Sequence, residues 1–116
     1  MRLKDRVAIV TGAAGGIGQA IAMAFAEEGA TIMAADINEI GAAETIKEIR
    51  AASGTGSSCR VDVTDVETVR QMVADTISAY KKVDIIANVA GTGFRHSFLE
   101  AEAEDFERVM KVNLIG

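Results

Sequence analysis

The sequence predicts an α/β domain in which helices cover both faces of a parallel sheet. Short apolar segments alternate with longer segments of helical periodicity through all 116 residues, and strands joined in this way pair in parallel through right-handed crossovers. A glycine-rich turn, residues 11–18, follows the first apolar segment. The composition, 49% hydrophobic and only 4% aromatic, is typical of a globular domain with an aliphatic core. We therefore predict one domain over 1–116, a doubly wound sheet of about four strands that is truncated relative to larger sheets of this type.

The first half of the chain contains two expected strands and two expected helices. Residues 7–10 form a continuous apolar run, as in a parallel strand that is buried on both faces. A helix is expected from Gly16 to Glu28, ending at Gly29; its inward face would comprise Ile17, Ala20, Ile21, Ala24 and Phe25. A second strand, 30–35, ends at Asp36. The second helix runs from about 38 to 53, is closed by Gly54 and Gly56, and turns Ala42, Ile46 and Ile49 inward.

The second half repeats the pattern. A third strand is expected at 57–61, and Thr64 to Glu67 match a capping box with Thr64 as the cap. The helix that follows has the apolar stripe Val66, Val69, Val73, Ile77 and Tyr80. A fourth strand, 83–87, runs into 88–91. A last helix begins near 102–104, where acidic residues suit the positive end of the helix dipole.

The glycine-rich turn, Thr11-Gly-Ala-Ala-Gly-Gly-Ile-Gly18, predicts a phosphate-binding site. Gly12 and Gly16 have no Cβ, so they can adopt unusual backbone angles and let a phosphate approach the main chain. The free N–H groups at the start of the helix would then bind a pyrophosphate. Glycine spacing alone also fits a turn that only packs a helix on a strand. A Walker-type loop is excluded, because no Gly-Lys-Ser/Thr follows the glycines.

Acidic residues at two further strand ends support a dinucleotide site. A carboxylate at Asp36 can accept hydrogen bonds from both hydroxyls of an adenosine ribose and would repel a 2′-phosphate. Arg and Lys are absent from 13–15 and from Ile37 and Asn38, which also favours NAD over NADP. Asp36 could instead be a helix cap. Asp62 and Val63 could hold an adenine edge, although Asp62 could equally form a turn.

Together these segments resemble the N-terminal half of a short-chain dehydrogenase/reductase. The resemblance rests on 11–18, Asp36, 62–63, Asn88-Val-Ala-Gly91 and Val112-Asn-Leu-Ile-Gly116, which occur in the order and spacing of that family. It implies a Rossmann-like fold with NAD as cofactor. It also implies hydride transfer between nicotinamide and an alcohol or carbonyl substrate.

The resemblance implies roles for individual residues. The cofactor-binding set would be Gly12, Gly15, Gly16, Ile17, Gly18, Asp36, Ile37, Asp62, Val63, Asn88, Ala90 and Gly91. Asn113 would be the active-site asparagine that holds a water in the proton relay. Val89 departs from the second asparagine of the family's Asn-Asn-Ala-Gly segment.

The family's catalytic Ser and Tyr-x-x-x-Lys are missing from this sequence. Its one tyrosine, Tyr80, is followed four residues later by Asp84 rather than Lys, and is expected to pack on a helix face. We therefore expect the 116-residue chain to be inactive by itself. The alternative hypothesis is a non-catalytic module that binds a dinucleotide or a protein partner.

Composition limits the other classes of function. The formal net charge of -5 argues against nucleic-acid binding, and the lack of a long apolar stretch or signal peptide predicts a cytoplasmic protein without membrane contact. Cys59 is the only cysteine and is expected to be a buried strand thiol, while His96 is the only histidine, so no metal site is predicted. The substrate would be a small molecule, and the family resemblance implies a homo-oligomer formed through the helix after Leu99.

Overall fold

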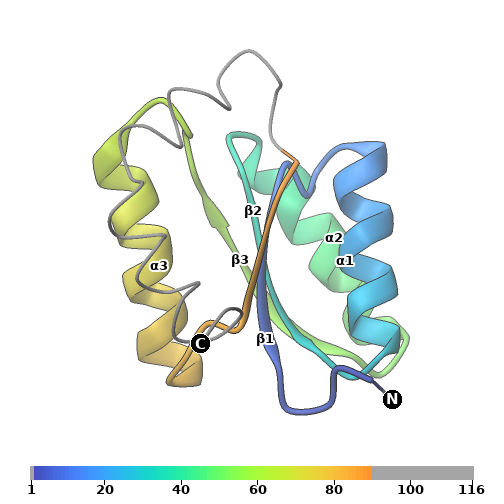
Figure 1. The fold of residues 1–116 in the computed structure, drawn as a ribbon. Coiled ribbons are helices and arrows are strands. Elements are labelled where there is room, and N and C mark those ends of the chain that lie inside the picture. The colour runs from blue at the N-terminus through green and yellow to red at the C-terminus, as the bar shows by residue number, and fades with distance from the viewer. Residues whose placement is uncertain (1, 90–116) are drawn as a thin grey trace.

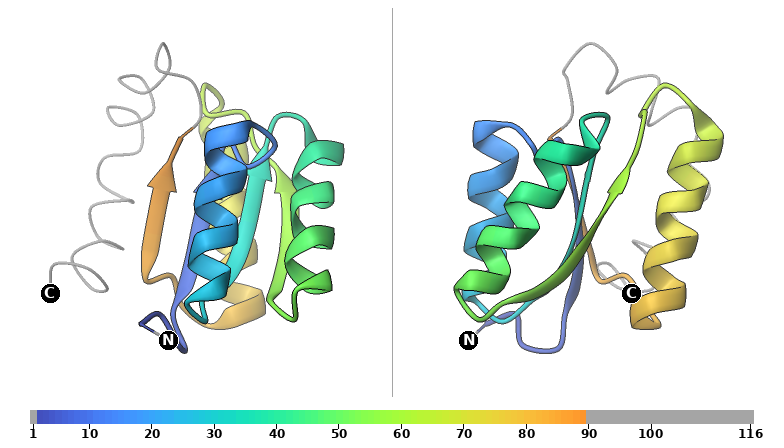
Figure 2. Two further views of the ribbon diagram at one scale, coloured as in Figure 1. Left: turned by 90° about the vertical axis from the view of Figure 1, so that its right-hand side faces the viewer. Right: turned by 180° about the vertical axis from the view of Figure 1, so that it is seen from behind.

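The computed structural model describes residues 2–89, which form a four-stranded parallel sheet with helices on both faces (Figure 1). The elements are β1 (Val7–Thr11), α1 (Gly16–Glu27), β2 (Thr31–Asp36), α2 (Glu39–Ala51), β3 (Thr55–Arg60), α3 (Val66–Tyr80) and β4 (Ile85–Asn88). Helices α1 and α2 lie on one face of the sheet and α3 lies on the other (Figure 2). The predicted α/β fold class is confirmed. The helix expected near 102–104 lies outside the described residues.

The strand order, β3-β2-β1-β4, places the segments predicted to bind the cofactor at one end of the sheet. These functional segments follow or end the four strands, at 11–18, Asp36, 62–63 and Asn88. The chain builds outward from β1 to β3 and then returns to the other side of β1, where β4 pairs with it in parallel. The direction of winding therefore reverses between β1 and β4. In a parallel sheet, a crevice at the carboxyl ends of the strands beside such a reversal is the usual ligand site.

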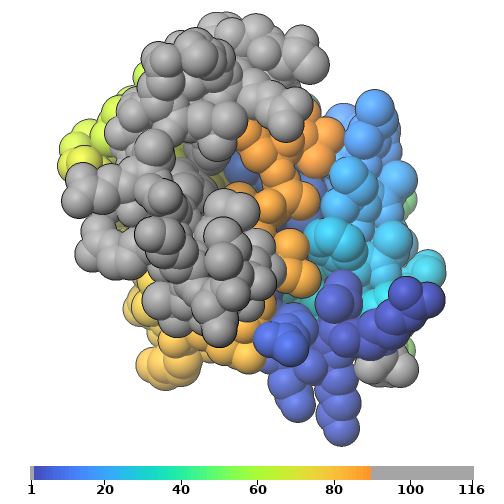
Figure 3. Space-filling view, viewed as in Figure 1, coloured from blue at the N-terminus to red at the C-terminus, as the bar shows by residue number. Residues whose placement is uncertain are grey.

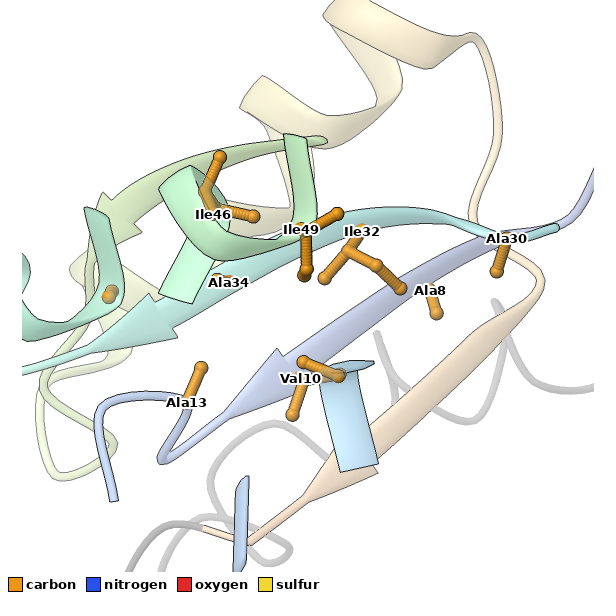
Figure 4. Close-up of a cluster of buried hydrophobic side chains, with 10 residues drawn as sticks. Ala8, Val10, Ala13, Ala30, Ile32, Ala34, Ile46 and Ile49 are labelled. Atoms are coloured by element: carbon orange, nitrogen blue, oxygen red, sulfur yellow. The ribbon is translucent and has the colours of Figure 1, made fainter. Parts of the chain in front are cut away.

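Two apolar clusters, one on each face, hold the helices to the sheet. Figure 4 shows the first cluster, in which side chains of β1 and β2 meet those of α2; its buried residues are Ala8, Val10, Ala13, Ala22, Ala30, Ile32, Ala34, Ala42, Ile46 and Ile49. The second, under α3, comprises Ile9, Met33, Ala35, Val61, Val69, Met72 and Val83. The expected inward face of α2 is confirmed. Among residues 2–89, no helix is long and apolar enough to cross a membrane.

The buried face of α1 differs from the prediction. The fully buried residues of α1 are Gly18 and Ala22, with Ile21 and Phe25 packed partly against the cluster. Ile17 is instead 72% exposed, and Ala20 and Ala24 are exposed as well. Gly18 must face the turn that precedes α1, because a Cβ there would lie 1.9 Å from the Gly12 carbonyl oxygen. This contact determines which side of α1 faces the sheet, so apolar periodicity alone predicted the wrong buried face.

The ends of α2 and the start of α3 also correct the sequence predictions. Helix α2 ends before Ser53, which takes a left-handed φ of 71°, and Gly56 lies inside β3 rather than closing the helix. A Cβ at Gly56 would stand 2.4 Å from the Ile32 carbonyl oxygen, which explains why a glycine occupies this position.

The N-cap of α3 is Asp65, whose carboxylate accepts from the Glu67 N–H at 3.0 Å. The predicted capping box at Thr64 is wrong by one residue. In the middle of α3, Met72 and Thr76 are buried and Ile77 is exposed.

A buried carboxylate joins β1 to the start of β4. Asp84 is 4% exposed, and its Oδ2 accepts from the Val7 N–H at 2.8 Å while the Asp84 N–H donates to the Val7 carbonyl at 2.8 Å. The Arg6 guanidinium lies 3.6 Å from Oδ1 and the Lys82 ammonium lies 3.0 Å from Oδ2. These contacts fix the pairing of β4 with β1 at the end of the sheet opposite the functional segments.

Replacing this carboxylate should destabilise the fold without touching the candidate site. We expect Asp84→Ala to lower the free energy of unfolding by about 2 to 3 kcal/mol, because the buried Val7 N–H loses a charged acceptor. Urea titration followed by circular dichroism measures the change. Asp75→Ala is the matched control, since this exposed carboxylate accepts from Gln71 on the surface of α3 and from no other described residue; it should cost less than about 0.5 kcal/mol. Equal costs for the two variants would contradict the role of Asp84.

Candidate functional site

Four segments of the chain converge at the carboxyl end of the sheet, as the sequence predicts. Gly12 follows β1, Asp36 ends β2, Asp62 follows β3 by two residues, and Asn88 ends β4. Residue pairing places Thr11 beside both Ala35 and Asn88. In the space-filling view, β4 (orange) and α1 (blue) both reach the viewed surface (Figure 3).

The turn between β1 and α1 depends on two glycines for different reasons. Gly12 has a φ of 72°, in the left-handed region that favours glycine, and its carbonyl accepts from the Gly15 N–H at 3.2 Å. A Cβ on Gly18 would lie 1.9 Å from the Gly12 carbonyl oxygen. Gly18 therefore allows α1 to approach the turn. The unusual backbone angle expected for Gly12 is found, but the one expected for Gly16 is not, because Gly16 has no positive φ. A Cβ at Gly16 would meet nothing within 4 Å.

The start of α1 presents three backbone donors without acceptors. Within the described part of the chain, no hydrogen bond engages the N–H groups of Gly16, Ile17 or Gly18, and the N-cap Gly15 supplies no side chain to them. The first turn of α1 has no acidic residue. Free N–H groups at the positive end of a helix bind phosphate groups, and the open space at Gly16 lets such a group approach the backbone. These residues fit the pyrophosphate of a dinucleotide.

Asp36 stands beside this turn and is held by it. Its Oδ2 accepts from the Ala14 N–H and its Oδ1 from the Asn38 N–H, both at 2.9 Å. The cap of α2 is Asn38, whose side chain accepts from the Gly41 N–H at 3.0 Å. Asp36 is therefore not the helix cap considered as its alternative role. Each carboxylate oxygen has a second lone pair, so Asp36 retains capacity to accept from ligand hydroxyls.

Asp62 forms the turn after β3. Its Oδ1 accepts from the Thr64 N–H at 3.0 Å and from the Thr64 hydroxyl at 2.6 Å, and these bonds lower the pKa of Asp62 below its usual value. The Thr68 hydroxyl accepts from the Asp62 N–H at 3.0 Å and donates to the Asp62 carbonyl at 2.8 Å. The next residue, Val63, packs partly against the cluster under α3. The turn-forming interpretation of Asp62 therefore holds, and any ligand contact would be additional to it.

The remaining predicted residues fall into two groups. Asn88 is half-buried, and its Oδ1 accepts from the Thr11 hydroxyl at 2.9 Å; the Val89 N–H donates to the Thr11 carbonyl at 3.3 Å. Ile37, next to Asp36, is 60% exposed at the same end of the sheet. The predicted residues Ala90, Gly91 and Asn113 lie outside the described residues, as does His96.

Two residues of α2 that the sequence pattern did not indicate support the turn. Thr45 is buried, and its hydroxyl donates to the Ala13 carbonyl at 2.7 Å. A Cβ on Gly41 would lie 2.6 Å from the Ala14 Cβ, so this glycine lets α2 approach the turn closely. The available signal was a threonine in the inward stripe of α2, between Ala42 and Ile49.

Cys59, on β3, is half-buried against the cluster under α3. Burial raises its pKa to about 11, and the negative charges of Asp75 and Glu39 act in the same direction. The thiolate is the reactive form, so at pH 8 we expect iodoacetamide to modify Cys59 about 100-fold more slowly than an unperturbed thiol, with the rate rising toward pH 11. The urea-unfolded chain is the control and should react at the ordinary rate. Equal folded and unfolded rates would contradict this prediction.

The sheet is parallel, its direction of winding reverses between β1 and β4, a glycine turn follows β1, and an acidic residue ends β2. This arrangement is typical of α/β domains that bind dinucleotides. The chain belongs to the short chain dehydrogenase family, whose model matches residues 6–116.

Named relatives are similar over the whole chain. The 3-oxoacyl-(acyl-carrier-protein) reductase FabG of Thermotoga maritima is 34% identical over 116 residues, 100% of this chain and 47% of that protein. The 7alpha-hydroxysteroid dehydrogenase of Escherichia coli K12 is 37% identical over 116 residues, 100% of this chain and 45% of that protein. The chain thus spans less than half the length of these curated relatives.

Solved structures agree with the fold. A hydroxysteroid dehydrogenase from Escherichia coli superposes with a TM-score of 0.77 at 40% identity, over 79% of this chain and 39% of that one. A short chain dehydrogenase from Mycobacterium paratuberculosis bound to NAD has a TM-score of 0.74 at 35% identity, over 78% of this chain and 38% of that one. The predicted family and Rossmann-like fold are both confirmed.

Proposed function

We propose that this chain forms the cofactor site of an NAD(H)-dependent oxidoreductase of the short-chain type. One observation carries the proposal: the N–H groups of Gly16, Ile17 and Gly18 lie at the same end of the sheet as the Asp36 carboxylate. Among residues 2–89, nothing accepts a hydrogen bond from these three groups. The three N–H groups suit a pyrophosphate, and the Asp36 carboxylate suits an adenosine ribose. Similarity to a structure bound to NAD supports the same cofactor.

The choice of NAD over NADP rests on charge. Asp36 is an acceptor for ribose hydroxyls and would repel a 2′-phosphate. Gly15 in the glycine turn and Ile37 directly after Asp36 are uncharged, so neither residue supplies a cation for a 2′-phosphate. Adenine would lie near Ile37 and Val63. Asp62 Oδ2 would be its acceptor, because among residues 2–89 only Oδ1 of this carboxylate accepts hydrogen bonds.

The reaction we propose is hydride transfer between the cofactor and a small alcohol or carbonyl compound. The nicotinamide ring supplies the hydride chemistry when the cofactor is bound. Tyr80 does not suit proton transfer there, because it lies on α3 and its hydroxyl hydrogen-bonds with Ser57 on β3. Residues 1–116 lack a Tyr-x-x-x-Lys, so we propose that they bind cofactor without turnover by themselves. Asn113 would hold a water molecule in the proton relay. We also propose that the protein is cytoplasmic and forms a homo-oligomer.

Titration with NADH and with NADPH tests the proposed function. We expect NADH to bind the full chain at least about tenfold more tightly than NADPH, as measured by calorimetry or by the fluorescence of the reduced nicotinamide. ADP should compete with NADH, because it carries the same ribose and pyrophosphate groups. Absence of binding by either dinucleotide would refute the cofactor site, and tighter NADPH binding would refute the assignment of NAD.

A further inference from the structure

One peptide group of the glycine turn is hydrogen-bonded at both ends by side chains. The carbonyl of Ala13 accepts from the Thr45 hydroxyl at 2.7 Å. The N–H of the same peptide group, which belongs to Ala14, donates to Asp36 Oδ2 at 2.9 Å. The preceding N–H, that of Ala13, donates to the Ala35 carbonyl at 3.2 Å. Helix α2 and strand β2 therefore fix the plane of this peptide from opposite sides.

The packing of α2 against the sheet does not require the hydroxyl group of Thr45. Thr45 is 2% exposed and lies on the buried side of the helix with Ala42 and Ile46. Its bond to the Gly41 carbonyl, one turn earlier in α2, is the longer one at 3.3 Å. Since valine has the same shape as threonine and is fully apolar, packing alone would favour valine at this position.

We propose that Thr45 is a positioning residue that presets the phosphate-binding turn and the Asp36 carboxylate for the dinucleotide. This inference rests on the proposed function, since it names the residue that orients the same site. Rotation of the Ala13–Ala14 peptide would break both side-chain bonds together. With the peptide fixed, α1 begins at Gly16, and the N–H groups of Gly16, Ile17 and Gly18 bond to no acceptor among the described residues. Asp36 is held where the ribose hydroxyls would bind.

The two hydrogen bonds also reinforce each other. A donor on the Ala13 carbonyl polarises the peptide and makes the Ala14 N–H a stronger donor to Asp36. Thr45 therefore acts on Asp36 through one peptide group, although the two side chains belong to different elements. Loss of the hydroxyl should weaken the Ala14–Asp36 bond as well as the bond that it makes directly.

The test compares three variants of the full chain by two measurements. Thr45→Val removes the hydroxyl at constant shape, Thr45→Ser keeps it, and Thr76→Val is the matched control, because the buried Thr76 hydroxyl donates to Met72 within α3, far from the turn in sequence. We expect Thr45→Val to weaken NADH binding about tenfold, with Thr45→Ser and Thr76→Val within about twofold of the parent. The ligand-free measurement is amide exchange by NMR, in which Thr45→Val should speed exchange of the Ala14 N–H at least about fivefold.

The two measurements separate this inference from the proposed function. If the parent binds no dinucleotide, the proposed function fails and with it the cofactor role of Thr45, whatever the exchange rates show. If the parent binds NADH but Thr45→Val matches Thr76→Val in affinity, the positioning role is refuted while the cofactor site stands. If Thr45→Val does not fold, exchange of the Thr45 hydroxyl proton is measured by NMR in the parent chain. Slow exchange of this proton supports its bond to the Ala13 carbonyl, and rapid exchange overturns the proposal.

Discussion

Substituting Gly18 by alanine should both destabilise the domain and greatly weaken dinucleotide binding. The new Cβ would stand 1.9 Å from the Gly12 carbonyl oxygen and 2.6 Å from its carbonyl carbon. Both are backbone atoms, so no side-chain rotation relieves the contact and α1 must move away from the turn. We expect a loss of about 3 kcal/mol in the free energy of unfolding and at least about 100-fold in NADH affinity, since the three helix amides move with α1.

The neighbouring glycine supplies the matched control. A Cβ at Gly16 would meet no atom within 4 Å, and alanine is a better helix former than glycine. Gly16→Ala should therefore keep or improve stability. It should still weaken NADH binding, because the methyl group would occupy the space through which a phosphate reaches the backbone. Urea titration and calorimetry on the two variants give the comparison; equal stability for Gly18→Ala and Gly16→Ala would refute the packing role of Gly18.

The sequence was sufficient to predict the fold and the place where the site forms. Apolar runs such as 7–10 identify strands that are buried on both faces, and helices between them require parallel pairing. Parallel strands end at one edge, so the turn after β1, Asp36 and Asn88 had to lie together. That conclusion needed only the order of strands and helices along the chain, not their tertiary contacts.

The sequence-based predictions that the structure contradicts concern features that depend on tertiary contacts. Apolar periodicity assigned Ile17 to the core, but the contact of Gly18 with the Gly12 carbonyl sets the rotation of α1 and leaves Ile17 exposed. Thr45 was missed because its partner, the Ala13 carbonyl, is a backbone group 32 residues away in sequence. Side-chain to backbone bonds over such separations have no sequence pattern, whereas local ones such as Asp62 with Thr64 do.

Substituting Asp36 by alanine should change which dinucleotide the protein prefers. The variant loses the charged acceptor that we propose for two ribose hydroxyls, and the Ala14 and Asn38 N–H groups lose their partners. A hydrogen bond to a charged group contributes about 1.5 to 3 kcal/mol, so NADH affinity should fall about 100-fold. NADPH affinity should fall much less or rise, because the repulsion of its 2′-phosphate disappears with the carboxylate. Calorimetric titration of both dinucleotides measures the ratio.

Two further variants separate the charge from the hydrogen bonds of Asp36. Asp36→Asn keeps an acceptor for the Ala14 N–H but removes the charge, so it should relieve the repulsion of NADPH while costing NADH less than alanine does. Glu39→Ala removes an equal charge three residues later, on the exposed first turn of α2, and should leave the NADH to NADPH ratio within about twofold of the parent. If Glu39→Ala changed the ratio as much as Asp36→Ala, preference would arise from the net charge of this end of the sheet. An unchanged ratio in Asp36→Ala would instead show that ribose recognition lies elsewhere.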